Sequence, residues 1–259
     1  MIDTHCHLDV EAFDRDREAV IARAGAAGVL GMLVPAIRPR TWAAVLGLAS
    51  RHRGAGVRCA IGIHPQSVPE LDAAELADLE QRLADAAGGS TADEVIAIGE
   101  CGLDAATGAL ELQARIFRAH LRVAHGLDKP LVIHVLRAHD LAPRILREEA
   151  AVRGVLHSYS GGAALVPVYR DLGMAFSFAG PITYPNARRP VLAARAVPAE
   201  LLLAETDAPD QAPAAHRGSR SEPAFLPSVI AGLAAARGTT CDEIAASTAA
   251  NARRIFGTW

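Results

Sequence analysis

The chain has 259 residues, of which 51% are hydrophobic and 21% charged, and its formal net charge is −3. This length suits one barrel-sized domain spanning residues 1–259 better than two small domains. The slightly negative net charge argues against a broad nucleic-acid-binding surface, but it is compatible with a local pocket that binds one or two phosphates.

Short apolar runs rich in β-branched residues alternate with longer amphipathic stretches along the whole chain. Eight of these runs have the length and composition of strands. They span residues 2–7, 28–35, 59–64, 95–103, 130–136, 154–159, 174–178 and 201–207. Strands that alternate with helical segments in this way indicate parallel βα units.

The segments between the strands carry helix start and stop signals. Four predicted helices end at or just before a glycine, the usual residue after a helix; they cover residues 16–27, 71–87, 112–124 and 223–237. A last helix is expected to begin at the capping box of Thr240 and Glu243 and to run to residue 256. Together these elements predict a closed (β/α)₈ barrel, because a doubly wound sheet would normally show a glycine-rich phosphate loop after its first strand.

Residues that bind metals stand at the ends of six predicted strands. They are His5, His7, His64, Glu100, His134, His157 and Asp207. The carboxyl ends of the strands in a parallel barrel meet at one face, where active sites lie, so we expect these side chains to converge. A lone histidine after an apolar run is more often an ordinary core residue, but a set of this size at one end of the strands favours a metal site.

The set exceeds the needs of one catalytic metal ion, which typically takes three protein ligands. It suggests a binuclear site with ions about 3.5–4 Å apart. Such a pair needs a bridging ligand. Lys129, the only lysine, precedes Pro130 at the wrong end of its strand, so Glu100 is the expected bridge. Zinc, iron, cobalt and manganese suit these ligands, and magnesium suits them less readily.

Seven segments of the chain also match a known family. They are IDTHCHLD at 2–9, GIHP at 62–65, IGECGLD at 98–104, VIH at 132–134, GVLHSYSG at 154–161, ETDAP at 205–209 and NARRIF at 251–256. With these motifs the chain resembles the TatD family of metal-dependent deoxyribonucleases over nearly its whole length. The resemblance implies an amidohydrolase-like barrel that hydrolyses phosphodiesters, typically removing nucleotides from the 3′ ends of DNA or short oligonucleotides.

The resemblance also implies roles for individual residues. The metal ligands of the family fall on His5, His7, Glu100, His134, His157 and Asp207. The histidine of its Gly-x-His-Pro motif falls on His64, which in the family lies near the substrate phosphate and contributes to catalysis.

The chain departs from the family pattern in three segments, and all three departures concern substrate contact. Asp104 is followed by alanine, where the family often has an aromatic residue. Leu136 and Arg137 stand where many members carry arginine and then an acidic residue, and Ser221 stands where many carry asparagine. Arg137 and the nearby His139 are expected in a solvated first turn of a helix, with contact to a phosphate as the alternative. These departures bear on specificity and leave the predicted metal ligands complete.

The expected mechanism is attack by a water molecule activated by two divalent ions. Asp207, His64 and Glu100 form the predicted catalytic set, in which Asp207 ligates metal and accepts the proton of the water. His64 and Arg217 would stabilise charge on the phosphate oxygens. Asp104 is either a substrate contact or a loop cap.

Two other functions fit the same residues. The binuclear centre could hydrolyse a small ester, lactone or cyclic amide, because a barrel fold does not determine its chemistry. A non-catalytic adaptor that retains an old site is the other alternative, and the complete ligand set disfavours it.

The cysteines and the N-terminal segment indicate the cellular compartment in which the protein is expected. Cys6, Cys59, Cys101 and Cys241 are widely spaced and form no CxxC pair, which suits a reducing compartment better than a disulfide framework. Cys6 is expected to pack in the core. No signal-peptide pattern and no apolar run of membrane-spanning length is present. We therefore expect a cytoplasmic monomer without membrane contact.

Overall fold

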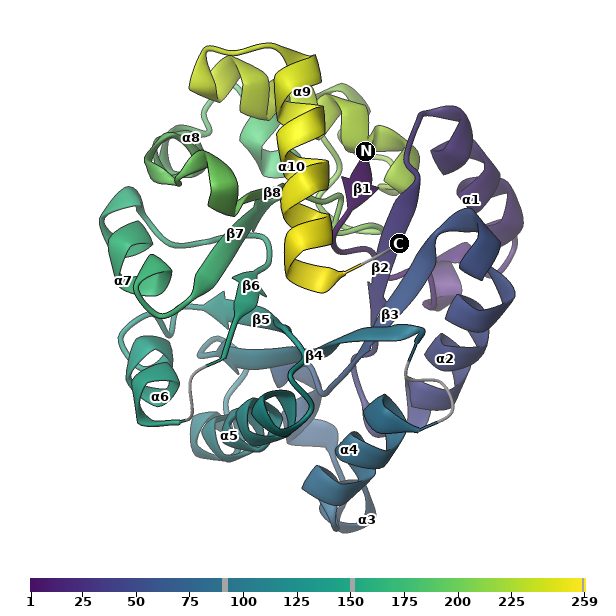
Figure 1. The fold of residues 1–259 in the computed structure, drawn as a ribbon, viewed down its shortest axis with the longest axis vertical. Helices are drawn as coiled ribbons and strands as arrows, with labels where there is room; N and C mark the ends of the chain where they lie inside the picture. The colour runs from purple at the N-terminus through teal and green to yellow at the C-terminus, as the bar shows by residue number, and fades with distance from the viewer. Residues whose placement is uncertain (90–92, 150–151, 258) are drawn as a thin grey trace.

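The computed structural model describes residues 1–89, 93–149, 152–257 and 259. Parallel strands follow one another around a barrel in the order β1 to β8, with helices outside them (Figure 1). The strands are β1 (Ile2–Asp3), β2 (Gly31–Pro35), β3 (Val57–Ile61), β4 (Val95–Asp104), β5 (Leu131–Leu136), β6 (Gly154–Leu156), β7 (Met174–Phe178) and β8 (Leu202–Ala204). The helices are α1 (Arg17–Ala26), α2 (Trp42–Arg51), α3 (Ala73–Leu76), α4 (Leu79–Gly88), α5 (Leu110–Gly126), α6 (Ala142–Glu148), α7 (Val166–Arg170), α8 (Arg188–Ala196), α9 (Leu226–Arg237) and α10 (Cys241–Phe256). The predicted (β/α)₈ fold is confirmed.

One apolar side chain from each strand packs inside the barrel. These are Ile2, Leu33, Ala60, Ala97, Val132, Val155, Ala175 and Leu203. Helix α10 adds Ala252, Ile255 and Phe256 to this cluster, and in Figure 1 it lies across the ring of strands. Because successive side chains of a strand point to opposite faces, the others point outward and pack with the helices in a second, larger cluster. Helix α10 therefore closes one end of the barrel and leaves the other end for polar residues.

The barrel closes along a seam between the segments that follow β1 and β8. The Thr4 N–H donates to the Ala204 carbonyl at 3.2 Å, and the His7 N–H donates to the Ala208 carbonyl at 2.7 Å. Cys6 forms an isolated parallel bridge with Ala208 and is fully buried, which confirms its expected packing role. The seam thus joins the first and last segments of the sheet by backbone hydrogen bonds, and the Asp3 carboxylate adds side-chain contacts by accepting from the N–H and the hydroxyl of Thr206 at 2.9 Å and 2.6 Å.

Four predicted strands end earlier than expected, at Asp3, Ile61, Leu156 and Ala204. The regular ladder of hydrogen bonds stops there because the backbone turns to direct its next side chains over the end of the barrel. The candidate ligands near these strands therefore lie in the segments that follow them, not on the strands themselves.

The predicted helix 71–87 is interrupted in the structure. Asp78 takes a left-handed conformation with φ of 48°, which breaks the run of i→i−4 hydrogen bonds and separates α3 from α4. Helix α3 begins at the capping residue Asp72, whose carboxylate accepts from the Glu75 N–H at 2.8 Å. No helix in the described part of the chain reaches the length and hydropathy of a membrane-spanning segment.

Candidate metal centre

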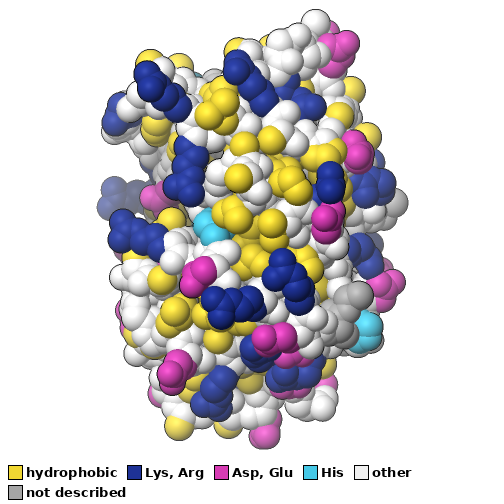
Figure 2. Space-filling view, turned by 90° about the vertical axis from the view of Figure 1, so that its left-hand side faces the viewer, with side chains coloured by type: hydrophobic (Ala, Val, Ile, Leu, Met, Phe, Trp, Pro, Cys, Tyr) yellow, Lys and Arg dark blue, Asp and Glu magenta, His cyan; other side chains and the backbone are white. Residues whose placement is uncertain are grey.

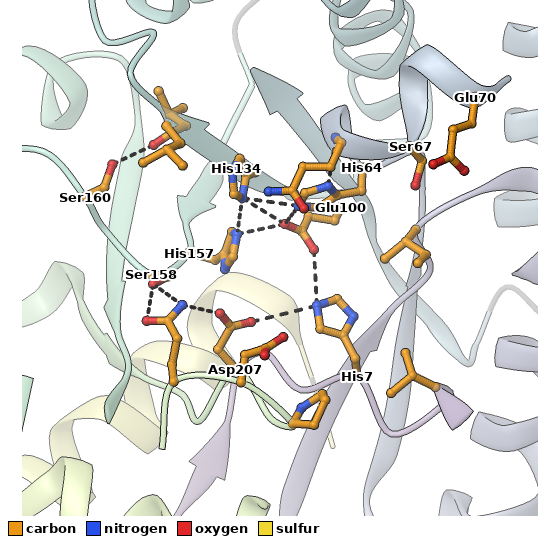
Figure 3. Close-up of a pocket in the computed structure, with 18 residues that line it drawn as sticks. His7, His64, Ser67, Glu70, Glu100, His134, His157, Ser158, Ser160 and Asp207 are labelled. Atoms are coloured by element: carbon orange, nitrogen blue, oxygen red, sulfur yellow. Dashed lines mark hydrogen bonds and ion pairs between the residues drawn. The ribbon is translucent and has the colours of Figure 1, made fainter. Parts of the chain in front are cut away.

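A pocket of about 730 Å³ opens at the carboxyl ends of the strands. Its lining includes six of the predicted site residues, namely His7, His64, Glu100, His134, His157 and Asp207. In Figure 3 these side chains point toward one another around Glu100. His5 is fully buried, and its Nε2 lies 3.2 Å from Nε2 of His7. The structure therefore brings all seven candidate residues together.

One group of ligand atoms surrounds Oε2 of Glu100. This oxygen lies 3.1 Å from Nε2 of His5 and 3.5 Å from Nε2 of His7. Oδ1 of Asp207 lies 3.6 Å and 3.8 Å from the same two nitrogens. His5, His7 and Asp207 can each offer one ligand atom within 4.8 Å of the others, so this group could hold a metal ion.

A second group surrounds Oε1 of Glu100. This oxygen lies 2.9 Å from Nε2 of His64, 3.3 Å from Nδ1 of His134 and 2.8 Å from Nε2 of His157. The facing nitrogens of His134 and His157 are 3.0 Å apart. Glu100 thus directs its two oxygens to two different groups of imidazoles.

The surroundings of Glu100 fit a bound cation. Its side chain is 1% exposed, and both oxygens face histidine nitrogens at 2.8–3.5 Å. A buried carboxylate is costly unless its charge is compensated, and imidazole with carboxylate is a usual ligand set for divalent transition metals. Lys129 lies at the opposite end of the barrel, where its ammonium donates to the Val95 carbonyl, so it cannot bridge ions here.

Charge in the pocket keeps the Glu100 carboxyl ionised. Burial alone would raise the pKa of Glu100, but the imidazoles of His64, His157 and His5 outweigh burial and hold this pKa well below its usual value. Burial lowers the pKa of His5 and of His64, which favours neutral rings there, whereas neighbouring carboxylates outweigh burial and raise the pKa of His134 and of His157. Metal ions bind ionised carboxylates and neutral imidazoles, so a cation entering the pocket would displace protons from those two rings.

His64 differs from the other histidines in its hydrogen bonding. The Gln66 backbone N–H donates to Nδ1 of His64 at 3.0 Å. A ring nitrogen that accepts a hydrogen bond carries no proton, so the neutral ring keeps its proton on Nε2. That nitrogen faces Glu100 as an N–H donor, whereas a metal ligand must offer a lone pair. The distances alone would also allow His64, Glu100 and His134 to hold an ion, but the hydrogen bond from Gln66 favours a donor role.

Three residues that sequence analysis did not single out support the ligands. Glu205 is fully buried; its Oε1 accepts from the Ser158 N–H and lies 3.6 Å from Nδ1 of His157. Nε2 of Gln211 donates to Asp207 and, at 2.7 Å, to Oγ of Ser158. Glu205 could have been found from its position two residues before Asp207, which places both on one face of an extended segment. Gln211 lies in a loop that carries no such signal.

The two other predicted substrate contacts lie outside the pocket lining. Asp104 is fully buried behind His134, with its Oδ2 3.7 Å from Nε2 of that ring. Its Oδ1 accepts from the Ala106 N–H at 2.9 Å, which is a loop-cap contact. The nearby His134 ring, together with the Gln66 amide that donates to Oδ2 at 2.9 Å, holds the pKa of Asp104 below its usual range. Arg217 is exposed and stacks over the ring of Tyr184, 5.1 Å from its centroid.

The prediction of a solvated helical turn at His139 is wrong. Its ring is hydrogen-bonded to the Tyr169 hydroxyl at 2.8 Å and to Oγ of Ser160 at 3.0 Å, and α6 begins only at Ala142. The loop after β5 folds toward the loop after β6, which buries the ring and lowers the pKa of His139 to about 4. Arg137 is exposed.

A (β/α)₈ barrel with histidines and carboxylates gathered at the carboxyl ends of its strands defines the class of barrel metal-dependent hydrolases. The family model described as TatD related DNase matches residues 2–257. The chain therefore belongs to the TatD family of metal-dependent hydrolases, and the resemblance inferred from its motifs is confirmed.

Individual relatives cover nearly the whole chain. It is 32% identical over 260 residues to the uncharacterized metal-dependent hydrolase YabD of Bacillus subtilis, which covers 99% of this chain and 98% of that protein. It is 34% identical over 266 residues to the 3′-5′ ssDNA/RNA exonuclease TatD of Erwinia amylovora, at 99% and 100% coverage. The crystal structure of YjjV, a TatD homologue from Escherichia coli, matches with a TM-score of 0.91 and 32% identity over 100% of this chain and 98% of that one.

Proposed function

We propose that the protein is a two-metal phosphodiesterase that removes nucleotides from the 3′ end of a single-stranded nucleic acid, with DNA as the leading substrate. The observation that carries this proposal is the division of the Glu100 oxygens between two groups of imidazoles. A carboxylate placed in this way can bridge two ions. Two ions held by these residues would stabilise both the attacking and the leaving oxygen of a phosphoryl displacement.

We assign the metal ligands as His5, His7, Glu100, His134, His157 and Asp207. Zinc, manganese, iron, cobalt and magnesium are the candidate ions for this mixture of imidazole and carboxylate. Two bound divalent ions would lower the pKa of a water molecule and offset charge on the phosphate.

The side chains of this protein supply the remaining steps. Gln211 holds one oxygen of Asp207, which leaves Oδ1 facing the first ligand group, where it can accept the proton of the attacking water. With Glu100 engaged by metal, the Nε2–H of His64, which lies 2.9 Å from Oε1 of Glu100, would be available to donate to a phosphate oxygen of the substrate, where negative charge develops. Glu205 orients His157, as carboxylates behind metal-binding histidines do.

The distribution of charge favours contact with a strand end over contact with a long duplex. Figure 2 shows the flank of the barrel on the left of Figure 1, where basic and acidic side chains are interspersed around a hydrophobic area. The chain as a whole carries a net charge of −3. A substrate gripped at one or two phosphates would give a shallow salt dependence of binding.

The test is an assay of metal-loaded protein on three substrates: a 5′-labelled single-stranded DNA, an aryl phosphodiester and an aryl ester. We expect the DNA to shorten from its 3′ end and the diester to be cleaved, both activities to stop with a chelator, and both to return with zinc or manganese. Cleavage of the ester alone would overturn the proposal and favour a hydrolase of small esters, lactones or cyclic amides. Two bound ions without any activity would indicate a binding protein.

A further inference from the structure

A second, smaller pocket of about 210 Å³ lies beside the metal centre. It shares Ser158, Ser160 and Gln211 with the lining of the larger pocket, so the two are neighbours across this polar wall. The rest of its lining is largely apolar and includes Phe178 and Ile182. A small apolar pocket with a few polar groups on one side is a typical setting for part of a ligand.

Arg189 is the only charged side chain among the described residues that line this smaller pocket. It is exposed at the start of α8 and makes no ion pair or hydrogen bond within the described ranges. Arg118 on α5, by contrast, pairs with Glu148 at 2.5 Å. The guanidinium of Arg189 is therefore available to a ligand, and its planar fork of donors matches the oxygens of a phosphate.

We propose that the smaller pocket holds the nucleoside on the 5′ side of the scissile phosphate and that Arg189 binds the next phosphate of the strand. This inference rests on the proposed function, since the scissile phosphate must lie at the metal centre. A polynucleotide leaving that centre must enter a neighbouring space, and this pocket offers an apolar surface for base and sugar followed by one free cation. Apart from Arg189 and the Tyr159 hydroxyl, which donates to the Gly162 carbonyl, its polar side chains lie on the shared wall, so we expect little preference among the four bases.

Substrates with one and with two phosphates distinguish a defect in this subsite from a defect at the metal centre. A thymidine dinucleotide has only the scissile phosphate, whereas a trinucleotide cut at its 3′ end has one more phosphate for Arg189. For Arg189→Ala we expect kcat/KM on the trinucleotide to fall about tenfold, equivalent to ~1.4 kcal/mol and near the low end for a hydrogen bond to a charged group. The dinucleotide rate is expected to stay within about twofold, as no contact is lost there.

Two further variants control for charge and geometry. Arg188 is the exposed neighbour of Arg189 and does not line the pocket, so Arg188→Ala removes the same charge and is expected to leave both substrates unaffected. Arg189→Lys keeps the charge without the fork and is expected to give an intermediate trinucleotide rate. The slope of log kcat/KM against log salt on the trinucleotide should be shallower by about 0.7 in Arg189→Ala, the value for one phosphate contact on a single strand.

The outcomes are distinct. Equal losses on both substrates, no loss with Arg189→Ala, or the same loss with Arg188→Ala would overturn the subsite while leaving the phosphodiesterase intact. If wild-type protein loaded with metal cleaves neither oligonucleotide, the proposed function itself fails and the subsite with it.

Discussion

Replacing Glu100 with glutamine tests the bridging role, because it preserves the size of the side chain and removes its charge. Glu100 faces both groups of imidazoles, so the substitution is expected to weaken the binding of both ions. His7 faces only the Oε2 group. His7→Gln is the matched control, and it is expected to weaken the binding of one ion.

The magnitude follows from the number of ions affected. Losing a residue that supports a ligand lowers metal affinity about 10–100-fold, and losing a ligand should reach at least the upper value. A 100-fold loss equals about 2.8 kcal/mol. Glu100→Gln is therefore expected to remove about 5.5 kcal/mol of metal-dependent stabilisation and His7→Gln about half of that. At about 2 °C per kcal/mol for a chain of this size, the zinc-induced rise in Tm should shrink by roughly 10 °C and 5 °C respectively.

The assay compares thermal unfolding of each variant with and without saturating zinc. Each metal-free variant is its own reference, so any effect of the lost charge on the metal-free protein cancels in the difference. Metal content after desalting supplies a second readout, with about two ions expected for wild type, one for His7→Gln and fewer for Glu100→Gln. If Glu100→Gln lost no more of the zinc-induced rise than His7→Gln, the carboxylate would serve one ion and the bridge would be refuted.

The remaining predictions concern single contacts. His64→Ala is expected to lower kcat about 10²–10³-fold with two ions still bound; loss of an ion would show instead that His64 is a ligand. Glu205→Gln is expected to weaken zinc binding about 10–100-fold in a chelator competition, and unchanged affinity would contradict its supporting role. In Gly62→Ala the new Cβ would lie 2.4 Å from a backbone carbon of β4, so urea unfolding should show a loss of about 1–3 kcal/mol; Gly54→Ala, which meets nothing within 4 Å, should stay within about 0.5 kcal/mol of wild type. Burial lowers the pKa of His120 to about 4, so the unfolded chain, with a pKa near 6.5, takes up the proton first as the pH falls. The metal-free protein should therefore lose about 3 kcal/mol between pH 6.5 and 4 that His120→Gln does not lose, and parallel pH profiles would contradict this.

The meeting of the candidate ligands at one site could be predicted from the sequence because a parallel barrel is symmetric. A residue at the carboxyl end of any strand lies at the same face as the corresponding residues of the others. His5, Glu100 and His157 could therefore be placed together without knowing a single contact, although β1 and β6 end before the histidines that follow them. The alternation of apolar and amphipathic runs in the sequence therefore predicts the order of the strands and approximately where each strand ends.

Contacts between loops could not be predicted in the same way. Gln211 reaches Asp207 and Ser158 from a loop with no periodic pattern. The burial of His139 depends on a tyrosine and a serine from later segments, so its position beside an apparent helix start was misleading. Arg189 likewise could not be singled out from the sequence, because its proposed role depends on the smaller pocket that it lines, and no residue spacing predicts that pocket.

The seam of the barrel has a consequence for when this protein can act. His5 and His7 lie on one side of the seam and Asp207 on the other, and the paired residues Thr4 and Ala204 are 200 positions apart in the chain. A nascent chain therefore carries two of the proposed ligands from the start but gains Asp207 only after all eight strands have been made. Bringing such distant segments together is the slowest kind of contact to form in folding. The group of His5, His7 and Asp207 would thus be complete only in a finished barrel, and a partly synthesised chain would lack the proposed metal centre.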